Sequence, residues 1–178
     1  MNVVLTGLRG TGKSSVGKVL ARRLNFTFVD TDTLIEELAG SRIAKIVAQH
    51  GWDHFRALEG QVVARVATAD RQVIAAGGGA CMDEENAQHL KANGLVVLLV
   101  CDLPILQRRI ALESNRPSLT GQAPADVELA QVWEARRARY YAIADLTYDV
   151  SEASADKAHD LQRKAAAIQA LLQQTAQL

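Results

Sequence analysis

Residues 7–14 read Gly-Leu-Arg-Gly-Thr-Gly-Lys-Ser and fit the pattern G-x-x-x-x-G-K-[ST] of a phosphate-binding loop. They follow an apolar run, Val3 to Leu5, and precede a segment with helical apolar spacing. This context suits the pattern, because glycines let backbone N–H groups surround a phosphate and the helix N-terminus adds positive charge. Lys13 is expected to reach the β- and γ-phosphates of a nucleoside triphosphate, and the Ser14 hydroxyl to bind Mg²⁺. The expected nucleotide-binding residues here are Gly10, Thr11, Gly12, Lys13, Ser14 and Ser15.

Four further apolar runs follow the first, and each is bounded by Gly, Asp or Asn. Several are apolar on both faces, which is typical of strands in a buried parallel sheet. Helical patterns lie between them. One ends at Gly40 and opens with a sequence that resembles a capping box, Thr33-x-x-Glu36; a second ends at Gly51, and a third begins near Trp52. The alternation predicts a three-layer α/β domain with right-handed crossovers. The five expected strands are Val3–Leu5, Phe26–Val29, Gln72–Ala75, Leu95–Cys101 and Leu146–Val150.

The last third of the chain contains a long loop between two helical patterns. Residues 103–112 have helical spacing, whereas residues 113–126 hold two prolines, a glycine and two serines. A loop of that length in a compact domain is usually functional or disordered. The closing helix has an apolar stripe that is expected to dock on the sheet, formed by Leu161, Ala165, Ile168 and Leu172.

The composition fits one globular domain over residues 1–178. Lys and Arg number 20, as do Asp and Glu, so the net charge is zero and offers no general attraction for nucleic acid or an anionic membrane. The longest apolar run, residues 95–101, is too short to span a bilayer, and no signal segment opens the chain. Two cysteines make no disulfide framework. We expect a cytoplasmic monomer that binds a small molecule.

Other nucleotide-binding classes fit the sequence less well. A GTPase would carry N-K-x-D and D-x-x-G segments, and neither occurs. A mechanical ATPase would need a partner domain, for which the chain has little room. Asp102 ends an apolar strand and could imitate a magnesium-binding aspartate, but Leu103-Pro104 follows at once, which favours a helix N-cap. A small kinase is the favoured class.

Candidate acceptor residues follow the second and third expected strands. Asp30 and Asp32 come where the carboxyl end of a parallel strand should lie beside the phosphate loop. One carboxylate could hold a magnesium-bound water while the other orients or deprotonates the acceptor hydroxyl, although both could simply cap a helix. Arg56 and Glu59 share a helix face at i, i+3, a spacing that is normally a solvated surface bridge.

Three glycines, residues 77–79, follow the third strand, where backbone N–H groups could approach a ligand closely. Farther on, Arg116-Pro117 lies in the long loop and Arg136-Arg137 in the helix before the fifth strand. Taken in order, G-x-x-G-x-G-K-S, D-T-D, F-R-x-x-E, G-G-G, R-P and a late helix arginine make a sequence that resembles shikimate kinase from Val3 to about Val150.

The resemblance implies a nucleoside-monophosphate-kinase-like P-loop fold. Its parallel sheet would have five strands in the order 2-3-1-4-5, with substrate-binding helices at about 31–65 and a mobile lid at about 112–126. The implied reaction is phosphorylation of the 3-hydroxyl group of shikimate by MgATP, a step of chorismate and aromatic amino-acid synthesis.

The resemblance also implies roles for single residues. Lys13 and Ser14 would serve the phosphates and magnesium, Asp30 would approach the metal through water, and Asp32 would bind the acceptor hydroxyls and act as base. The remaining implied positions are Arg56 and Arg136 at the substrate carboxylate, Gly78 and Gly79 facing the substrate, Arg109 against the adenine, and Arg116 as a lid arginine at the transferred phosphoryl group. Arginine suits these sites because its forked donors match carboxylate and phosphate.

The sequence departs from the family pattern in two places. The late helix motif R-x-P-L-Y lacks its proline in residues 136–140, so either Arg136 or Arg137 could hold the carboxylate. Residues 51–54 replace the usual Gly-Glu pair, and Trp52 could line the substrate pocket or belong to the core. Two other readings remain open: another small-metabolite kinase, such as a gluconate kinase, and a nucleotide-binding regulatory or assembly domain without turnover.

Overall fold

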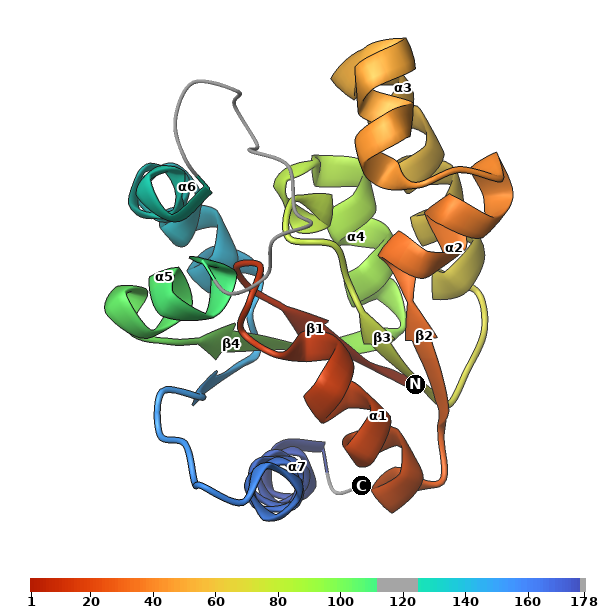
Figure 1. The fold of residues 1–178 in the computed structure, drawn as a ribbon. Helices are drawn as coiled ribbons and strands as arrows, with labels where there is room; N and C mark the ends of the chain where they lie inside the picture. Colours follow the sequence, from red (N-terminus) through yellow and green to blue (C-terminus); the bar gives the residue numbers. More distant parts are fainter. Residues whose placement is uncertain (112–124, 177–178) are drawn as a thin grey trace.

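The computed structural model describes residues 1–111 and 125–176 (Figure 1). The strands are β1 (Asn2–Thr6), β2 (Thr27–Asp30), β3 (Gln72–Ala75), β4 (Gly94–Val100) and β5 (Leu146–Asp149). The helices are α1 (Lys13–Leu24), α2 (Thr31–Ala39), α3 (Ile43–Ala67), α4 (Glu84–Ala92), α5 (Leu103–Ala111), α6 (Ala125–Ile143) and α7 (Lys157–Ala176), with a short 3₁₀ helix, η1, at Ala80–Met82.

The five strands form one parallel sheet in the order β2-β3-β1-β4-β5. In the register of the central strand, Val3 lies between Val73 of β3 and Leu95 of β4. All five strand positions expected from the apolar runs are confirmed to within one or two residues, and so is the predicted sheet order. Because the strands are parallel, β1, β2 and β3 all end at the same edge of the sheet, where ligands gather in such folds.

The central strand is buried on both faces, which explains why its sequence does not alternate with polar residues. Val3 and Leu5 face a core cluster shared with α1 and α7, whereas Val4 faces a second cluster with α3 and α4. Figure 1 shows α1 and α7 below the sheet and α4 on its other side. The predicted apolar stripe of the last helix does dock there, since Ala165 and Ile168 are fully buried in the first cluster.

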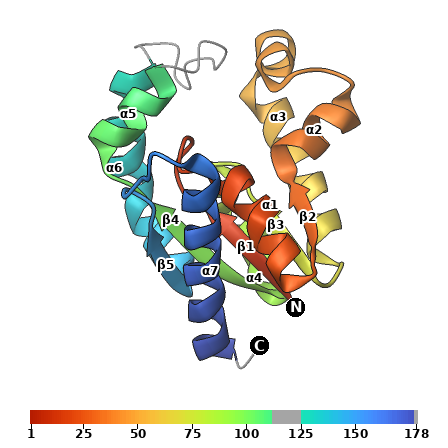
Figure 2. The same cartoon turned by 60° about the horizontal axis from the view of Figure 1, so that its bottom comes forward.

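Helices α5 and α6 pack against each other beside β4 and form a third cluster around Leu98, Leu106 and Leu129. Figure 2 shows these two helices rising at one side of the sheet and α2 with α3 rising at the other. The carboxyl ends of β1, β2 and β3 therefore lie below two groups of helices that can supply side chains from opposite sides.

The structure corrects two local predictions and confirms a third. Helix α4 was not predicted; its N-terminus is capped by Asp83, whose carboxylate accepts from the N–H of Asn86 at 2.9 Å. The Thr33 capping box is wrong, because α2 begins at Thr31 and Asp30 is its N-cap. The predicted division at Gly51 is confirmed, because Gly51 has the non-helical angles φ 80° and ψ 174° and separates α3 into two helical parts.

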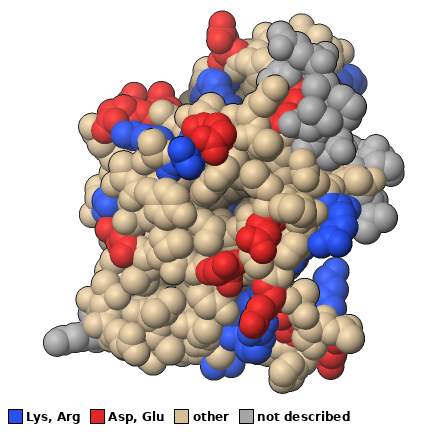
Figure 3. Space-filling view, turned by 90° about the vertical axis from the view of Figure 1, so that its left-hand side faces the viewer, with Lys and Arg blue, Asp and Glu red and all other residues tan. Residues whose placement is uncertain are grey.

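Charges of both signs are interspersed on the face that Figure 3 shows, as the balanced composition would suggest. Cys81 and Cys101 are both free thiols. Among the described residues, no helix has the length and apolar character needed to cross a membrane.

Candidate active site

The phosphate loop leads from β1 into α1 with the backbone that its glycines allow. Gly12 is the N-cap of α1 with φ 87°, a left-handed conformation that side chains other than glycine rarely adopt. The Lys13 ammonium folds back over the loop and donates to the carbonyls of Gly7 and Leu8, both at 2.9 Å. A cavity of about 160 Å³ lies at this loop, lined by Arg9, Gly10, Gly12, Lys13, Ser14, Ser15, Asp30, Asp32, Ala75, Ala76 and Gly78. Of the nucleotide-binding residues predicted at positions 10–15, only the buried Thr11 is not in its lining.

Asp30 connects this loop to the acceptor helices. Its Oδ2 accepts a hydrogen bond from the Ser14 hydroxyl at 2.6 Å. Its Oδ1 accepts from the backbone N–H groups of Asp32 at 3.1 Å and Thr33 at 3.4 Å, which caps α2. The two readings of Asp30, a helix cap and a neighbour of the metal site, are thus compatible, because each uses a different carboxylate oxygen.

The Ser14 and Asp30 oxygens fit a magnesium ion that is held mainly by phosphates. Within the described residues, no group of three or more His, Cys, Asp or Glu side chains could hold a metal by itself. Mg²⁺ in kinases usually takes one or two protein oxygens and completes its shell with water and substrate phosphates. A hydroxyl and a carboxylate oxygen 2.6 Å apart beside the phosphate loop match that requirement.

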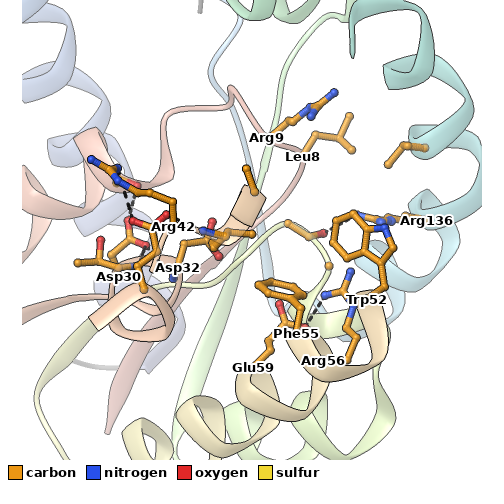
Figure 4. A pocket seen from close by; sticks show the side chains of 18 of the residues that line it. Leu8, Arg9, Asp30, Asp32, Arg42, Trp52, Phe55, Arg56, Glu59 and Arg136 are labelled. Carbon is orange, nitrogen blue, oxygen red and sulfur yellow. Dashed lines mark hydrogen bonds and ion pairs between the residues drawn. The ribbon is translucent and has the colours of Figure 1, made fainter. Parts of the chain in front are cut away.

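A larger cavity, of about 770 Å³, lies between α2–α3 and α6. Figure 4 shows Arg56, Glu59 and Arg136 on one side of it and Asp30 and Arg42 on the other, with Asp32 between them. The two cavities share a small set of lining residues, Arg9, Ser14, Asp30, Asp32 and Gly78. This junction is where a group held by the phosphate loop would meet an acceptor.

Arg56 and Glu59 form a half-buried ion pair rather than the solvated surface bridge that their spacing suggests, since Glu59 is buried while Arg56 remains partly exposed. Glu59 is only 1% exposed and accepts a hydrogen bond from Nη1 of Arg56. Burial raises the pKa of the Glu59 carboxyl above its ordinary value of 4.5, and the nearby Arg56 guanidinium opposes that rise. The Arg56 guanidinium also lies 5.6 Å from the centre of the Trp52 ring and 5.1 Å from that of Phe55. Trp52 therefore lines the cavity and supports the arginine.

The three glycines after β3 pass between these charged side chains. A methyl group on Gly77 would lie 2.6 Å from Oδ1 of Asp32 and 3.1 Å from Oε1 of Glu59. One on Gly79 would lie 2.6 Å from Nη2 of Arg56. The loop can therefore run beside two carboxylates and a guanidinium only because it lacks side chains. Gly78 and Gly79, the two predicted to face the substrate, line the larger cavity.

The structure distinguishes between Arg136 and Arg137, which the sequence left as alternatives for the carboxylate-binding arginine. Arg136 lines the larger cavity and donates from Nη1 to the Gly78 carbonyl at 3.1 Å. Arg137 instead pairs with Glu134 at 3.2 Å, and both side chains are more than half exposed. Of the two, Arg136 is the one placed to meet a ligand in this cavity.

Two predicted residues remain, Arg109 and Arg116. Arg109 of α5 reaches the phosphate loop and donates from Nη1 to the Gly10 carbonyl at 3.4 Å. Arg116, predicted as the lid arginine, lies outside the described residues, as does nearly all of the predicted lid at 112–126.

Arg9 of the cavity lining and two buried α6 residues beside the site were missed in the sequence. Arg9 occupies a variable position of the loop pattern, yet it lines both cavities, and its Nη2 lies 3.8 Å from Oε2 of the fully buried Glu128 on α6. Tyr140, also fully buried, donates its hydroxyl proton to the Gly78 carbonyl. Tyr140 lies four residues after Arg136, which places the two near one face of α6 and was the available signal.

Comparison with known proteins gives one family. A family model described as "Shikimate kinase" matches residues 9–173. The shikimate kinase of Synechococcus elongatus is 43% identical over 176 residues, which cover 99% of this chain and 90% of that protein.

Solved structures agree with the sequence comparison. The structure of the shikimate kinase from Acinetobacter baumannii in complex with shikimate has a TM-score of 0.87 and 30% identity, covering 98% of this chain and 94% of that one. A gluconokinase from Sinorhizobium meliloti has a TM-score of 0.53 and 15% identity over 98% of this chain and 97% of that one, a likeness of fold alone. On the match over residues 9–173 and this level of identity, the chain belongs to the shikimate kinase family, whose members phosphorylate shikimate with ATP.

Proposed function

We propose that the enzyme transfers the γ-phosphoryl group of ATP to the 3-hydroxyl group of shikimate at the junction of its two cavities. The observation that carries this is that Asp32 lines both the phosphate-loop cavity and the arginine-lined cavity. Phosphoryl transfer depends mainly on positioning and charge stabilisation, and this arrangement supplies both from rigid elements.

Nucleotide binding is assigned to the phosphate loop and the start of α1. The backbone N–H groups of Gly10, Thr11 and Gly12 would surround the β-phosphate, and Lys13 would exchange its contacts with the loop carbonyls for the β- and γ-phosphates. Ser14 and Asp30 would hold Mg²⁺, directly and through water respectively; when bound, the ion neutralises phosphate charge. Arg109, which already contacts Gly10, is assigned to the adenine.

Shikimate binding is assigned to the larger cavity. Arg56 and Arg136, two of the four arginines that line this cavity, would form charge-assisted, forked hydrogen bonds to the substrate carboxylate. Gly78 and Gly79 would approach the ring closely. Asp32 would accept hydrogen bonds from the ring hydroxyls and take the proton of the attacking 3-hydroxyl group, an acid–base contribution of about 10²–10⁴ in rate.

Three further assignments complete the proposal. Residues 1–178 form one P-loop kinase domain in which helices at about 31–65 bind the substrate, supported by the positions of Trp52, Phe55 and Arg56 in the cavity wall. Residues at about 112–126 act as a lid that delivers Arg116 to the transferred phosphoryl group. The enzyme works as a monomer in the cytoplasm.

A coupled ADP-release assay tests the function. We expect MgATP-dependent ADP release with shikimate, little with gluconate, and loss of turnover when EDTA removes magnesium. Turnover with gluconate in place of shikimate would assign the cavity to another small-metabolite kinase. The proposal would be contradicted if the rate of ADP release did not depend on any added acceptor while circular dichroism showed the protein to be folded.

A further inference from the structure

One carbonyl of the glycine loop is held by two side chains from α6. The Gly78 carbonyl accepts a hydrogen bond from the Tyr140 hydroxyl and another from Nη1 of Arg136 at 3.1 Å. The two donors lie four residues apart and therefore on one face of α6. A third α6 side chain, Arg139, donates from Nε to the Cys81 carbonyl at 3.2 Å. Helix α6 thus determines how the loop after β3 is oriented.

The orientation of the Gly78 carbonyl fixes that of the next N–H group. A trans peptide is planar, with its C=O and N–H on opposite sides, and no described peptide bond is cis. Because the Gly78 carbonyl faces Tyr140, the Gly79 N–H faces away from α6. Gly78 and Gly79 both line the larger cavity, so the rotation of the peptide between them decides whether its carbonyl or its N–H is presented to a ligand there. Between two glycines a peptide can rotate readily, so this orientation needs an external restraint.

Tyr140 is better suited than Arg136 to be that restraint. Arg136 lines the cavity, and its donors are required by the substrate carboxylate in the proposed function. Tyr140 has no exposed surface, and its ring stacks on Trp133 with the centroids 6.2 Å apart and an interplanar angle of 24°. Burial raises the pKa of Tyr140 to about 12, so the hydroxyl keeps its proton and remains a donor throughout the working pH range.

We propose that Tyr140 is a positioning residue that holds the Gly78–Gly79 peptide with the Gly79 N–H facing the acceptor. The hydroxyl keeps the carbonyl in place when Arg136 turns to the substrate, so the N–H donor is already oriented before the acceptor binds. The inference rests on the proposed function for the identity of the acceptor, but the orientation of the peptide does not depend on it.

The test is Tyr140→Phe, which removes one hydroxyl and leaves the buried ring, with Tyr141→Phe as the matched control. Tyr141 is the neighbouring tyrosine on α6, it is 52% exposed, and it also contacts Trp133 edge-on. We expect Tyr140→Phe to lower kcat/KM for shikimate at least about 3-fold, as the loss of one buried hydrogen bond should do. KM for ATP should stay within two-fold, and Tyr141→Phe should leave every constant within two-fold.

Hydrogen exchange provides a readout that is independent of turnover. In Tyr140→Phe, amides of residues 77–82 should exchange faster than in the wild type, while those of α7 should exchange as before. An unchanged kcat/KM for shikimate, or unchanged exchange at residues 77–82, would overturn the proposal. If the wild type itself does not turn over shikimate, the proposed function fails, and the exchange measurement still decides whether Tyr140 holds the loop.

Discussion

Replacing Glu59 by glutamine tests whether a buried carboxylate holds Arg56 in place for the substrate. Glu59 is 1% exposed and Arg56 is its partner in an i, i+3 ion pair on α3. Glutamine has nearly the same shape and can still accept one hydrogen bond through its carbonyl oxygen. Glutamine lacks the negative charge of glutamate. A hydrogen bond to a charged group is roughly twice as strong as one between neutral groups.

The size of the effect follows from that difference. A hydrogen bond to a charged group contributes about 1.5–3 kcal/mol, so halving it should cost about 0.8–1.5 kcal/mol, or roughly 4- to 12-fold in affinity. We expect KM for shikimate to rise by this factor in the ADP-release assay, while KM for ATP remains within two-fold. The matched control is Glu134→Gln, which alters the exposed i, i+3 pair with Arg137 and should change neither constant.

The stability that the Glu59 carboxyl contributes should fall as the pH rises. Burial raises the pKa of Glu59 above its ordinary value of 4.5, so the folded protein binds this proton more tightly than the unfolded chain. The carboxyl's contribution to stability is therefore largest below pH 4.5 and falls as the pH rises through the raised pKa. Glutamine does not titrate and escapes this fall.

Urea unfolding of both proteins at pH 4.5 and pH 7.5 measures this difference. The free energy of unfolding of Glu59→Gln minus that of the wild type should be larger at pH 7.5 than at pH 4.5, because only the wild type loses stability as Glu59 ionises. An unchanged KM for shikimate would refute the role of Glu59 in holding Arg56. A variant that loses stability relative to the wild type between the two pH values would refute the account of its burial.

Three other substitutions address the remaining assignments. Asp32→Asn should lower kcat at least about 100-fold, as expected for loss of a general base, and leave KM for ATP near normal; activity within a few-fold of the wild type would remove Asp32 from that role. Arg136→Met should raise KM for shikimate about 10- to 100-fold, whereas Arg137→Met should raise it less than two-fold; the opposite order would place the carboxylate at Arg137. Gly79→Ala should also raise KM for shikimate, because the added methyl would lie 2.6 Å from Nη2 of Arg56; a normal KM in titrations of folded protein would show that Arg56 can shift without loss.

The sheet and the phosphate loop could be predicted because their requirements are local. The strands are runs of four to seven residues, and the loop needs glycine where φ is positive, as at Gly10 and Gly12. Helix α4 was missed because its buried apolar residues are few, Ala87 and Leu90, and its main signal is a cap at Asp83 followed by two acidic residues. The capping box at Thr33 failed because β2 passes directly into α2 at Asp30.

The acceptor cavity was only partly predictable, because burial depends on distant segments. The spacing of Arg56 and Glu59 was plain, but nothing local shows that Glu59 is enclosed by α3 and the glycine loop. Likewise, Arg9 and Glu128 are 119 positions apart in the sequence and meet only because α6 packs beside the phosphate loop. Such contacts follow from the assembled layers and not from any one motif.

The break at Gly51 divides α3 into two parts with separate duties. Ile43 and Ala44, before it, contribute apolar side chains to the cavity lining, whereas Arg56 and Glu59, after it, contribute the ion pair. A straight helix would couple the two, since turning one would turn the other. Because a glycine separates the two parts, the lining residues before it can be substituted to admit acceptors of other sizes. Such substitutions need not move Arg56, the arginine assigned to the carboxylate. This gives a practical rule for redesign: acceptor size is to be varied before residue 51 and acceptor charge after it.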